Sequence, residues 1–151
     1  GELMSAAPTS AAEEVIVHLL KTSEAVSDFI KEGENHRLVP DQIPAGWKGN
    51  PGIVYEQQGD NRQRLVDGTE TGLIHATFSI YCITRNRGVS RAMTQAVRPA
   101  LAVNGSATIA GVRVRQVFVK NGERDESLPS ADGNEPPERY RAIDVVVHYR
   151  T

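Results

Sequence analysis

The sequence contains little cysteine, few aromatic residues and no long apolar stretch. Cys82 is the one cysteine in 151 residues, which excludes an internal disulfide and a cysteine-based zinc site. No unbroken apolar run exceeds four residues, as at positions 80–83, whereas about 20 are needed to cross a bilayer. No charged segment followed by an apolar one stands near the start. We therefore expect neither a membrane protein nor a secreted one.

A strong excess of charge of one sign is also missing. The chain has 17 Lys and Arg against 19 Asp and Glu, for a formal net charge of −2. A chain so close to neutrality is not expected to bind a polyanion over its whole surface. The sequence also has no dense run of Lys and Arg. Any basic face for nucleic acid would have to be local.

Motifs that carry chemistry are absent as well. The sequence has no phosphate-binding glycine loop, no HExxH, no GxSxG and no nucleophile–base pair. We therefore expect no catalytic residue, no bound cofactor and no metal, and Cys82 is expected to be a small buried hydrophobe. The histidines show no ligand-like pairing in sequence; they are His18, His36, His75 and His148.

The length is that of one domain, which we assign to residues 11–151. Residues 1–10 are expected to be disordered, and Gly1-Glu2-Leu3 before Met4 is typical of a cloning remnant. Ser10 and Glu13 form a capping box. The apolar stripe behind them predicts a helix over residues 11–32, ended by Gly33.

The rest of the chain is dominated by β patterns. Alternation predicts strands at 53–58, 73–84, 107–109, 112–120 and 140–149, with a helix capped by Ser90 and ending near Pro99. Residues 60–72 and 121–138 are predicted to be long polar loops. These elements favour an α+β fold, mainly an antiparallel sheet with two helices packed on one face.

Three local features allow more than one interpretation. Trp47, in an irregular connection over residues 33–51, is either a core plug or an exposed anchor. The charged run at 123–126 could bind a cation or act as acid and base, but it is more typical of a solvated loop. The arginines at 113, 115 and 141 could form a basic face, or they could pair with Asp144 or Glu56.

The order of elements and several short phrases resemble the tail-completion, or tail-terminator, proteins of long-tailed bacteriophages with non-contractile tails. The similarity runs from about residue 13 to residue 151, as a series of phrases rather than one motif. Pro99 and residues 127–137 depart from the pattern. The phrases include EEVIVHLLK (13–21), DQIPAG (41–46), PGIVY (51–55), LVDG (65–68), GVRV (111–114), ERYR (138–141) and DVVVHY (144–149).

This resemblance implies a structural protein at the head–tail junction of a virion, made in the cytoplasm of a host bacterium. A ring of six copies would cap the head-proximal end of the tail tube, end tube polymerisation and join tail to head. Its partners would be further copies of itself, the major tail tube protein and a head-completion or stopper protein. DNA would only pass through the channel, and no membrane would be involved.

We expect the contacts between subunits, or with the tube, to lie in residues 59–72 and 120–138. The four residues selected are Asp67, Gly68, Arg124 and Asp125, because they lie in polar loops. One alternative is another neck component, such as a head-closure or connector protein. The other is a small-molecule-binding or enzymatic α+β domain built around Trp47, Tyr55 and the histidines, which would need a closed apolar pocket.

Overall fold

The computed structural model describes residues 11–42, 44, 47, 50–64, 70–128 and 138–150. Three helices and nine strands lie in these ranges. The elements are α1 (Ala11–Thr22), α2 (Glu24–Ile30), β1 (Lys31–Glu32), β2 (Asn35–His36), β3 (Leu38–Pro40), β4 (Gly52–Arg64), β5 (Glu70–Thr84), α3 (Arg87–Leu101), β6 (Ala107–Ile109), β7 (Val112–Val119), β8 (Arg124–Leu128) and β9 (Glu138–Arg150).

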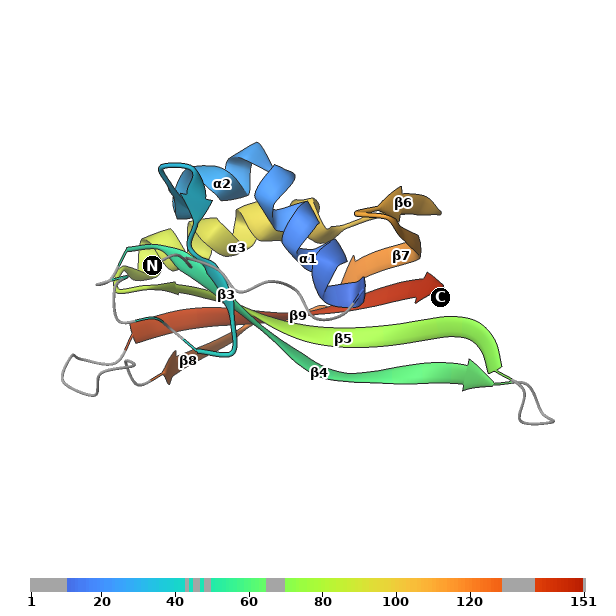
Figure 1. Cartoon of the computed structure of the whole chain (residues 1–151). Helices are drawn as coiled ribbons and strands as arrows, with labels where there is room; N and C mark the ends of the chain where they lie inside the picture. Colours follow the sequence, from blue (N-terminus) through green and yellow to red (C-terminus); the bar gives the residue numbers. More distant parts are fainter. Residues whose placement is uncertain are drawn as a thin grey trace.

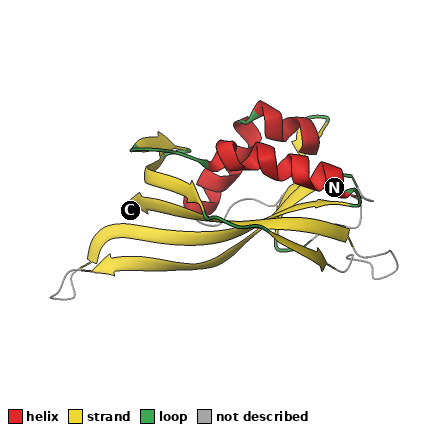
Figure 2. Cartoon of the chain, turned by 180° about the vertical axis from the view of Figure 1, so that it is seen from behind, coloured by secondary structure: helices red, strands yellow, loops and turns green. Residues whose placement is uncertain are grey.

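The main sheet has the strand order β3-β4-β5-β9-β7-β6, and β8 also pairs with β9. Every neighbouring pair in it is antiparallel except β3 with β4. In Figure 1 the strands β4, β5 and β9 run side by side, with the helices above them. Figure 2 shows from behind that the β4–β5 pair extends past the helices. The predicted α+β class and the mainly antiparallel sheet are confirmed.

The single helix predicted over residues 11–32 is wrong, because the segment forms two helices. Ser23 separates them as the N-cap of α2, and its Oγ accepts a hydrogen bond of 3.3 Å from the Val26 amide. The hydroxyl oxygen of a serine can bond nearby backbone amides in place of the helical hydrogen bonds, so serine favours a helix cap over a helix interior. Gly33 does not end a helix; with φ of 62° it lies in the turn between β1 and β2. Ser10, half of the predicted capping box, lies outside the described residues.

The predicted cap of the next helix is also wrong. Asn86 caps α3, and its Oδ1 accepts a hydrogen bond of 3.1 Å from the Val89 amide. Ser90 is instead buried in the helix and donates to the Cys82 carbonyl at 3.1 Å, which fastens α3 to β5. Pro99 lies in the last turn of α3, near the position where the helix ends.

The strands are longer than the alternation indicated. β4 continues to Arg64 and β5 begins at Glu70, so both extend into the predicted loop over 60–72. The loop predicted over 121–138 is also wrong in part, because β8 forms within it and pairs with β9. The connection between β6 and β7 is a two-residue turn, with φ of 51° at Ala110 and 79° at Gly111. Two consecutive residues of positive φ are typical of the tight turns in β-hairpins.

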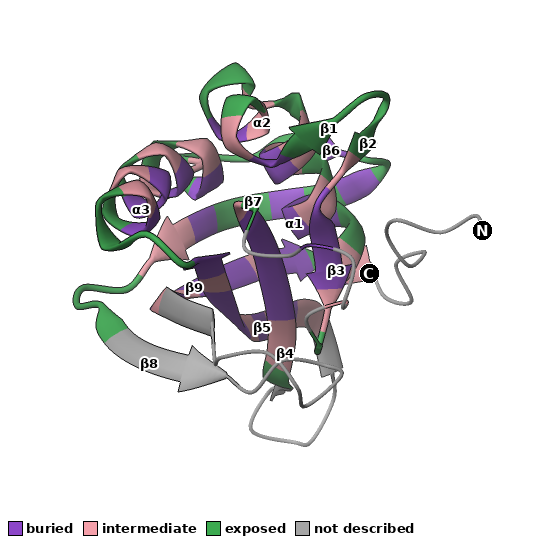
Figure 3. Cartoon of the chain, turned by 90° about the vertical axis from the view of Figure 1, so that its left-hand side faces the viewer, coloured by how far each residue is buried: buried purple, intermediate pink, exposed green. Residues whose placement is uncertain are grey.

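The core lies between the helices and the sheet. The buried sides of α1, α2 and α3 join alternate residues of the central strands in one cluster, and Figure 3 shows exposed residues on the outer sides of α2 and α3. On β5 this cluster takes Ile74, Ala76, Phe78, Ile80 and Cys82. Cys82 is fully buried, and burial raises the pKa of its thiol to about 12, as expected for an inert core cysteine.

A second, smaller cluster surrounds Trp47. The indole packs with Val39, Val54, Ile83 and Ala142, and only 3% of Trp47 is exposed. This confirms the core-plug interpretation of Trp47.

Candidate functional site

Of the four residues selected from sequence, Asp67 and Gly68 lie outside the described residues. Arg124 and Asp125 begin β8, where Asp125 is in register with Arg141 on β9. The side chain of Asp125 also lies outside the described part. Arg124 is exposed, and its Nη1 lies 2.8 Å from Oδ2 of Asp144.

The neighbouring Glu123 holds two arginines. Its Oε2 accepts a hydrogen bond from Nε of Arg98 at 3.2 Å, and its Oε1 accepts one from Nη1 of Arg141 at 3.0 Å. This carboxylate therefore ties the end of α3 to β9 across the segment that leads into β8. Arg141 thus pairs with Glu123, a partner that was not considered from sequence.

A row of polar side chains crosses the sheet next to these ion pairs. Ser79 on β5 donates to Oδ1 of Asp144 at 2.9 Å, and Gln58 on β4 donates to Oγ of Ser79 at 3.1 Å. Gln58 also donates to Oε1 of Glu56 at 2.7 Å. Ser79 alternates with the β5 residues of the main core, so this row lies on the opposite face of the sheet. We call the polar side chains on this side the polar face; the Trp47 cluster, with Val54, Ile83 and Ala142, lies on the same side of the sheet.

The polar face continues toward the carboxyl end of β9 with a histidine pair. His75 on β5 is directly opposite His148 on β9, and the rings stack with centroids 3.9 Å apart and planes inclined by 8°. The rings of Phe118 and His148 form a T-shaped contact, with their centroids 5.3 Å apart. Burial, and secondly the charge of His75, lower the pKa of His148 below its ordinary value, so the neutral form is favoured.

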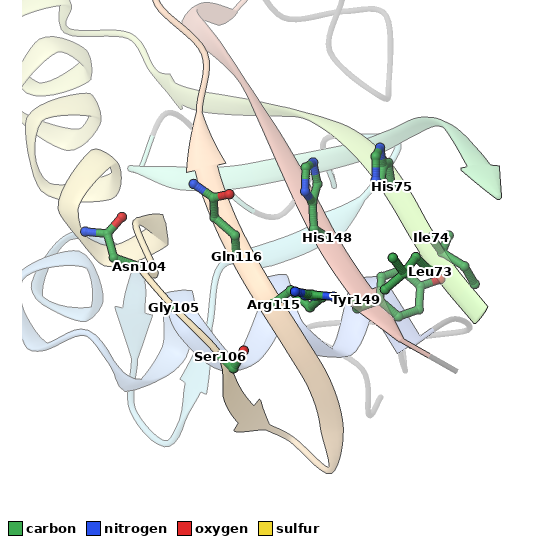
Figure 4. A pocket seen from close by; sticks show the side chains of 10 residues that line it. All are labelled: Leu73, Ile74, His75, Asn104, Gly105, Ser106, Arg115, Gln116, His148 and Tyr149. Carbon is green, nitrogen blue, oxygen red and sulfur yellow. The ribbon is translucent and has the colours of Figure 1, made fainter. Parts of the chain in front are cut away.

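Two adjoining hollows lie at this end of the sheet. The first, about 750 Å³, takes its lining from β5, β7, β9 and the α3–β6 connection; in Figure 4 the side chains of His75, His148 and Gln116 point to the same side from three neighbouring strands. The second, about 550 Å³, is lined by Ser106, Ala107, Thr108, Arg113, Val114, Arg115 and Arg150. We call the second one the arginine hollow.

The register explains why arginines meet there. Arg113 on β7 is directly opposite Arg150 on β9 and also opposite Thr108 on β6. Arg115 lies at a register irregularity between Val114 and Gln116, and its side chain lines both hollows. Arg113, Arg115 and Arg150 therefore line one hollow, whereas Arg141 lies at the ion pair with Glu123.

Sequence reasoning missed the histidine pair and the part played by Arg150. His75 and His148 occupy the polar side of two strands that were predicted correctly, so the alternation placed each of them on a wetter face. The missing information was that β5 and β9 are neighbours in this register. Pairing between strands far apart in sequence is not encoded in either strand alone.

The described side chains do not form a reaction centre that we can identify. Within the described ranges, no group of three or more His, Cys, Asp or Glu is placed to hold a metal ion. Among the helices of that same part of the chain, none has the length and apolar character needed to cross a bilayer. In comparisons with known proteins, no family model and no curated protein matches this chain.

Proposed function

We propose that the protein is a structural component of a bacteriophage virion that caps the head-proximal end of the tail tube as a ring of six copies. In this role it ends tube polymerisation and joins the tail to the head, without catalysis and without a cofactor. The series of phrases that resembles tail-terminator proteins, over residues 13–151, supports this function. The α+β fold is compatible with it.

The observation that carries the proposal is the outer edge of β4. β3 pairs with Ile53, Val54 and Tyr55 only, and among the described strands none pairs with that edge from residue 56 to residue 64. At about 3.4 Å per residue, this edge is roughly 30 Å long. An open edge of that length is a template for a strand from another chain, and its head-to-tail use by identical copies generates a ring where the rotation closes.

In the proposed ring the helices cover one face of the sheet, and the polar face remains for contacts with neighbours or with the channel. The tail tube protein and a head-completion protein bind the two ends of the ring. DNA passes through the middle. Residues 59–72 and 120–138, with Arg124 and Asp125, stay candidates for these contacts because each adjoins a strand at the border of the sheet.

A proline at Gln57 tests the role of the edge. On the outer side of β4, the Ile53 amide donates to the Arg37 carbonyl, and the Tyr55 carbonyl accepts from the Asp41 amide. Because backbone groups of alternate residues point to the same side of a strand, the Gln57 amide also points outward. Gln57→Pro removes this one donor from the edge, and Gln57→Ala, the control, removes only the side chain. Native mass spectrometry over a wide concentration range is expected to show a six-subunit species for wild type and Gln57→Ala, and mainly monomer for Gln57→Pro.

Two results would contradict the proposal. One is a monomer at every concentration both alone and with purified tail tubes; the other is undiminished assembly by Gln57→Pro. Circular dichroism establishes that each variant is folded. Binding to isolated tails that lack a terminator, rather than to DNA-filled heads, separates this function from that of a head-closure or connector protein.

A further inference from the structure

We propose that neighbouring copies of the chain recognise each other by charge, with a basic flank of one copy against an acidic flank of the next. The inference rests on the proposed ring and names the surfaces that meet in it. The basic flank is formed by α3 and the residue after β7, with Arg87, Arg91, Arg98 and Lys120. The acidic flank is formed by α2, the β1–β2 hairpin and the residue after β3, with Glu24, Asp28, Glu32, Glu34 and Asp41.

The two signs of charge are separated along the chain. Residues 71–122 hold seven Lys and Arg but neither Asp nor Glu, although the whole chain has more acidic than basic residues. Residues 11–42 have the opposite bias, with seven acidic residues against three basic ones, and one of the three, Arg37, is buried. The small net charge of the chain therefore conceals one basic and one acidic part.

The fold places these parts on different flanks of the molecule. α3 packs on β5, β7 and β9, whereas α2 packs on β4, and β3 forms the outer border of the sheet. Oγ of Ser27 on α2 lies 3.2 Å from Nε2 of His36 on β2, so the acidic elements adjoin each other. In Figure 3, α3 lies on one flank, and β1, β2 and β3 lie on the other. A copy cannot join its own two flanks, so only head-to-tail contact between copies brings them together.

Each flank carries like charges that repel each other within one copy. Arg87 and Arg91 are exposed and stand four residues apart on α3, as Glu24 and Asp28 do on α2. Like charges at this spacing destabilise a helix, and Arg87, in the first turn of α3, also opposes the helix dipole. An opposite charge from a neighbouring copy offsets both effects.

The carboxylate nearest to the basic flank in sequence does not neutralise it. Glu123 directly follows the acid-free segment, but its two oxygens accept from Arg98 and Arg141. In the described part of the chain, no carboxylate forms an ion pair with Arg87 or Arg91. These two guanidinium groups are therefore the part of the basic flank that an external partner can engage.

The acidic flank adjoins the open edge of β4, which the proposed ring uses. The Asp41 amide donates to the Tyr55 carbonyl at 3.0 Å, at the point where pairing between β3 and β4 ends. A neighbour that pairs with β4 from residue 56 onward therefore comes close to this flank. Backbone pairing is available to any strand, whereas complementary charge selects the partner and its orientation.

Charge reversal on each flank tests the inference. The basic-flank variant is Arg87→Glu with Arg91→Glu, and the acidic-flank variant is Asp28→Lys with Glu34→Lys; all four positions are exposed. In sedimentation velocity, each variant alone is expected to need at least about tenfold more protein than wild type to form the six-subunit species. Arg87→Lys with Arg91→Lys keeps the charge and is expected to assemble like wild type. Raising the salt should weaken wild-type assembly, because the screening length falls from about 10 Å at 0.1 M to about 3 Å at 1 M.

Complementation identifies the partner as a second copy. In an equimolar mixture of the two variants, every reversed flank can face a flank of opposite charge, so alternating rings should form. Native mass spectrometry with one variant labelled by ¹⁵N is expected to show equal numbers of the two. A chain that carries all four reversals has exchanged the charges of its flanks and should again assemble alone.

The outcomes separate this inference from the ring itself. If the reversal variants assemble as well as wild type, the charged flanks are not the interface, while the ring stands. If assembly is lost and neither the mixture nor the fourfold variant restores it, the inference is also overturned, and an acidic surface of another protein becomes the partner of the basic flank. A wild type that stays monomeric both alone and with purified tail tubes overturns the ring and this inference together. Circular dichroism establishes that each variant is folded.

Discussion

Gly52 has no room for a side chain, and replacing it with alanine tests the packing around Trp47. A Cβ atom built on Gly52 would lie 2.7 Å from both Cε3 and Cη2 of the indole, closer than Cβ atoms approach other atoms in real structures. The ring is poorly placed to move away, because it is 3% exposed and packs against Val39, Val54 and Ile83. We predict that Gly52→Ala lowers the free energy of unfolding by about 1–3 kcal/mol, the usual cost of overpacking a core.

Urea unfolding measures this cost. With an m-value of about 2 kcal/mol/M, a loss of 2 kcal/mol moves the midpoint down by about 1 M, while m itself stays unchanged. Gly59→Ala is the matched control, because it lies in the same strand and a Cβ there meets nothing within 4 Å. Its effect is expected to stay within about 0.5 kcal/mol.

A double-mutant cycle identifies the indole as the cause. Trp47→Leu makes space above Gly52, so adding Gly52→Ala in that background should cost at least about 1 kcal/mol less than in the wild type. The reasoning is refuted if Gly52→Ala costs no more than Gly59→Ala, or if it costs the same whether position 47 holds Trp or Leu.

Three more outcomes follow from the contacts. Ser23→Ala removes the acceptor for the Val26 amide and should lower the free energy of unfolding by about 0.5–2 kcal/mol in urea, whereas Ser23→Asp should retain most of it. Because the pKa of His148 is lowered below 6.5 in the fold, the unfolded chain takes up the proton first. Stability should therefore fall as the pH drops below that value, and less steeply in His148→Phe; parallel melting-temperature profiles would contradict this. Arg124→Glu should cost no more than about 1 kcal/mol, since its ion pair is exposed, and unchanged ring assembly would remove Arg124 from the interface.

Local patterns predicted the elements that bury one side regularly. The alternation in β5 and β9 and the apolar stripe of α1 each record a single buried face, so their type and approximate position follow from sequence alone. The break between α1 and α2 at Ser23 was not predicted, because Val26 and Ile30 continue the apolar stripe of α1 beyond it. The serine within the pattern, followed by Glu24, was the local indication of a new helix.

The candidate site depends on pairing between strands, which local sequence patterns do not record. β8 has the sequence RDESL, which neither alternates nor contains the usual strand formers, and it is a strand because β9 offers it a partner. Arg113 and Arg150 likewise meet only through the β7–β9 register. Both depend on contacts between segments distant in sequence, which local propensity does not encode.

The place of β9 in the sheet has a consequence for how the chain acquires its structure. β9 follows the other described strands in sequence, yet it pairs with β5 along residues 139–150 on one side and with β7 and β8 on the other. On the ribosome, β3, β4 and β5 can assemble early, but the edge of β5 stays open until β9 has emerged. The contact of Ser79 with Asp144 spans 65 residues, and closing such long loops slows folding. The edge of β5 therefore stays exposed in a nascent chain until residues 138–150 have been synthesised, and an exposed strand edge of this kind favours aggregation.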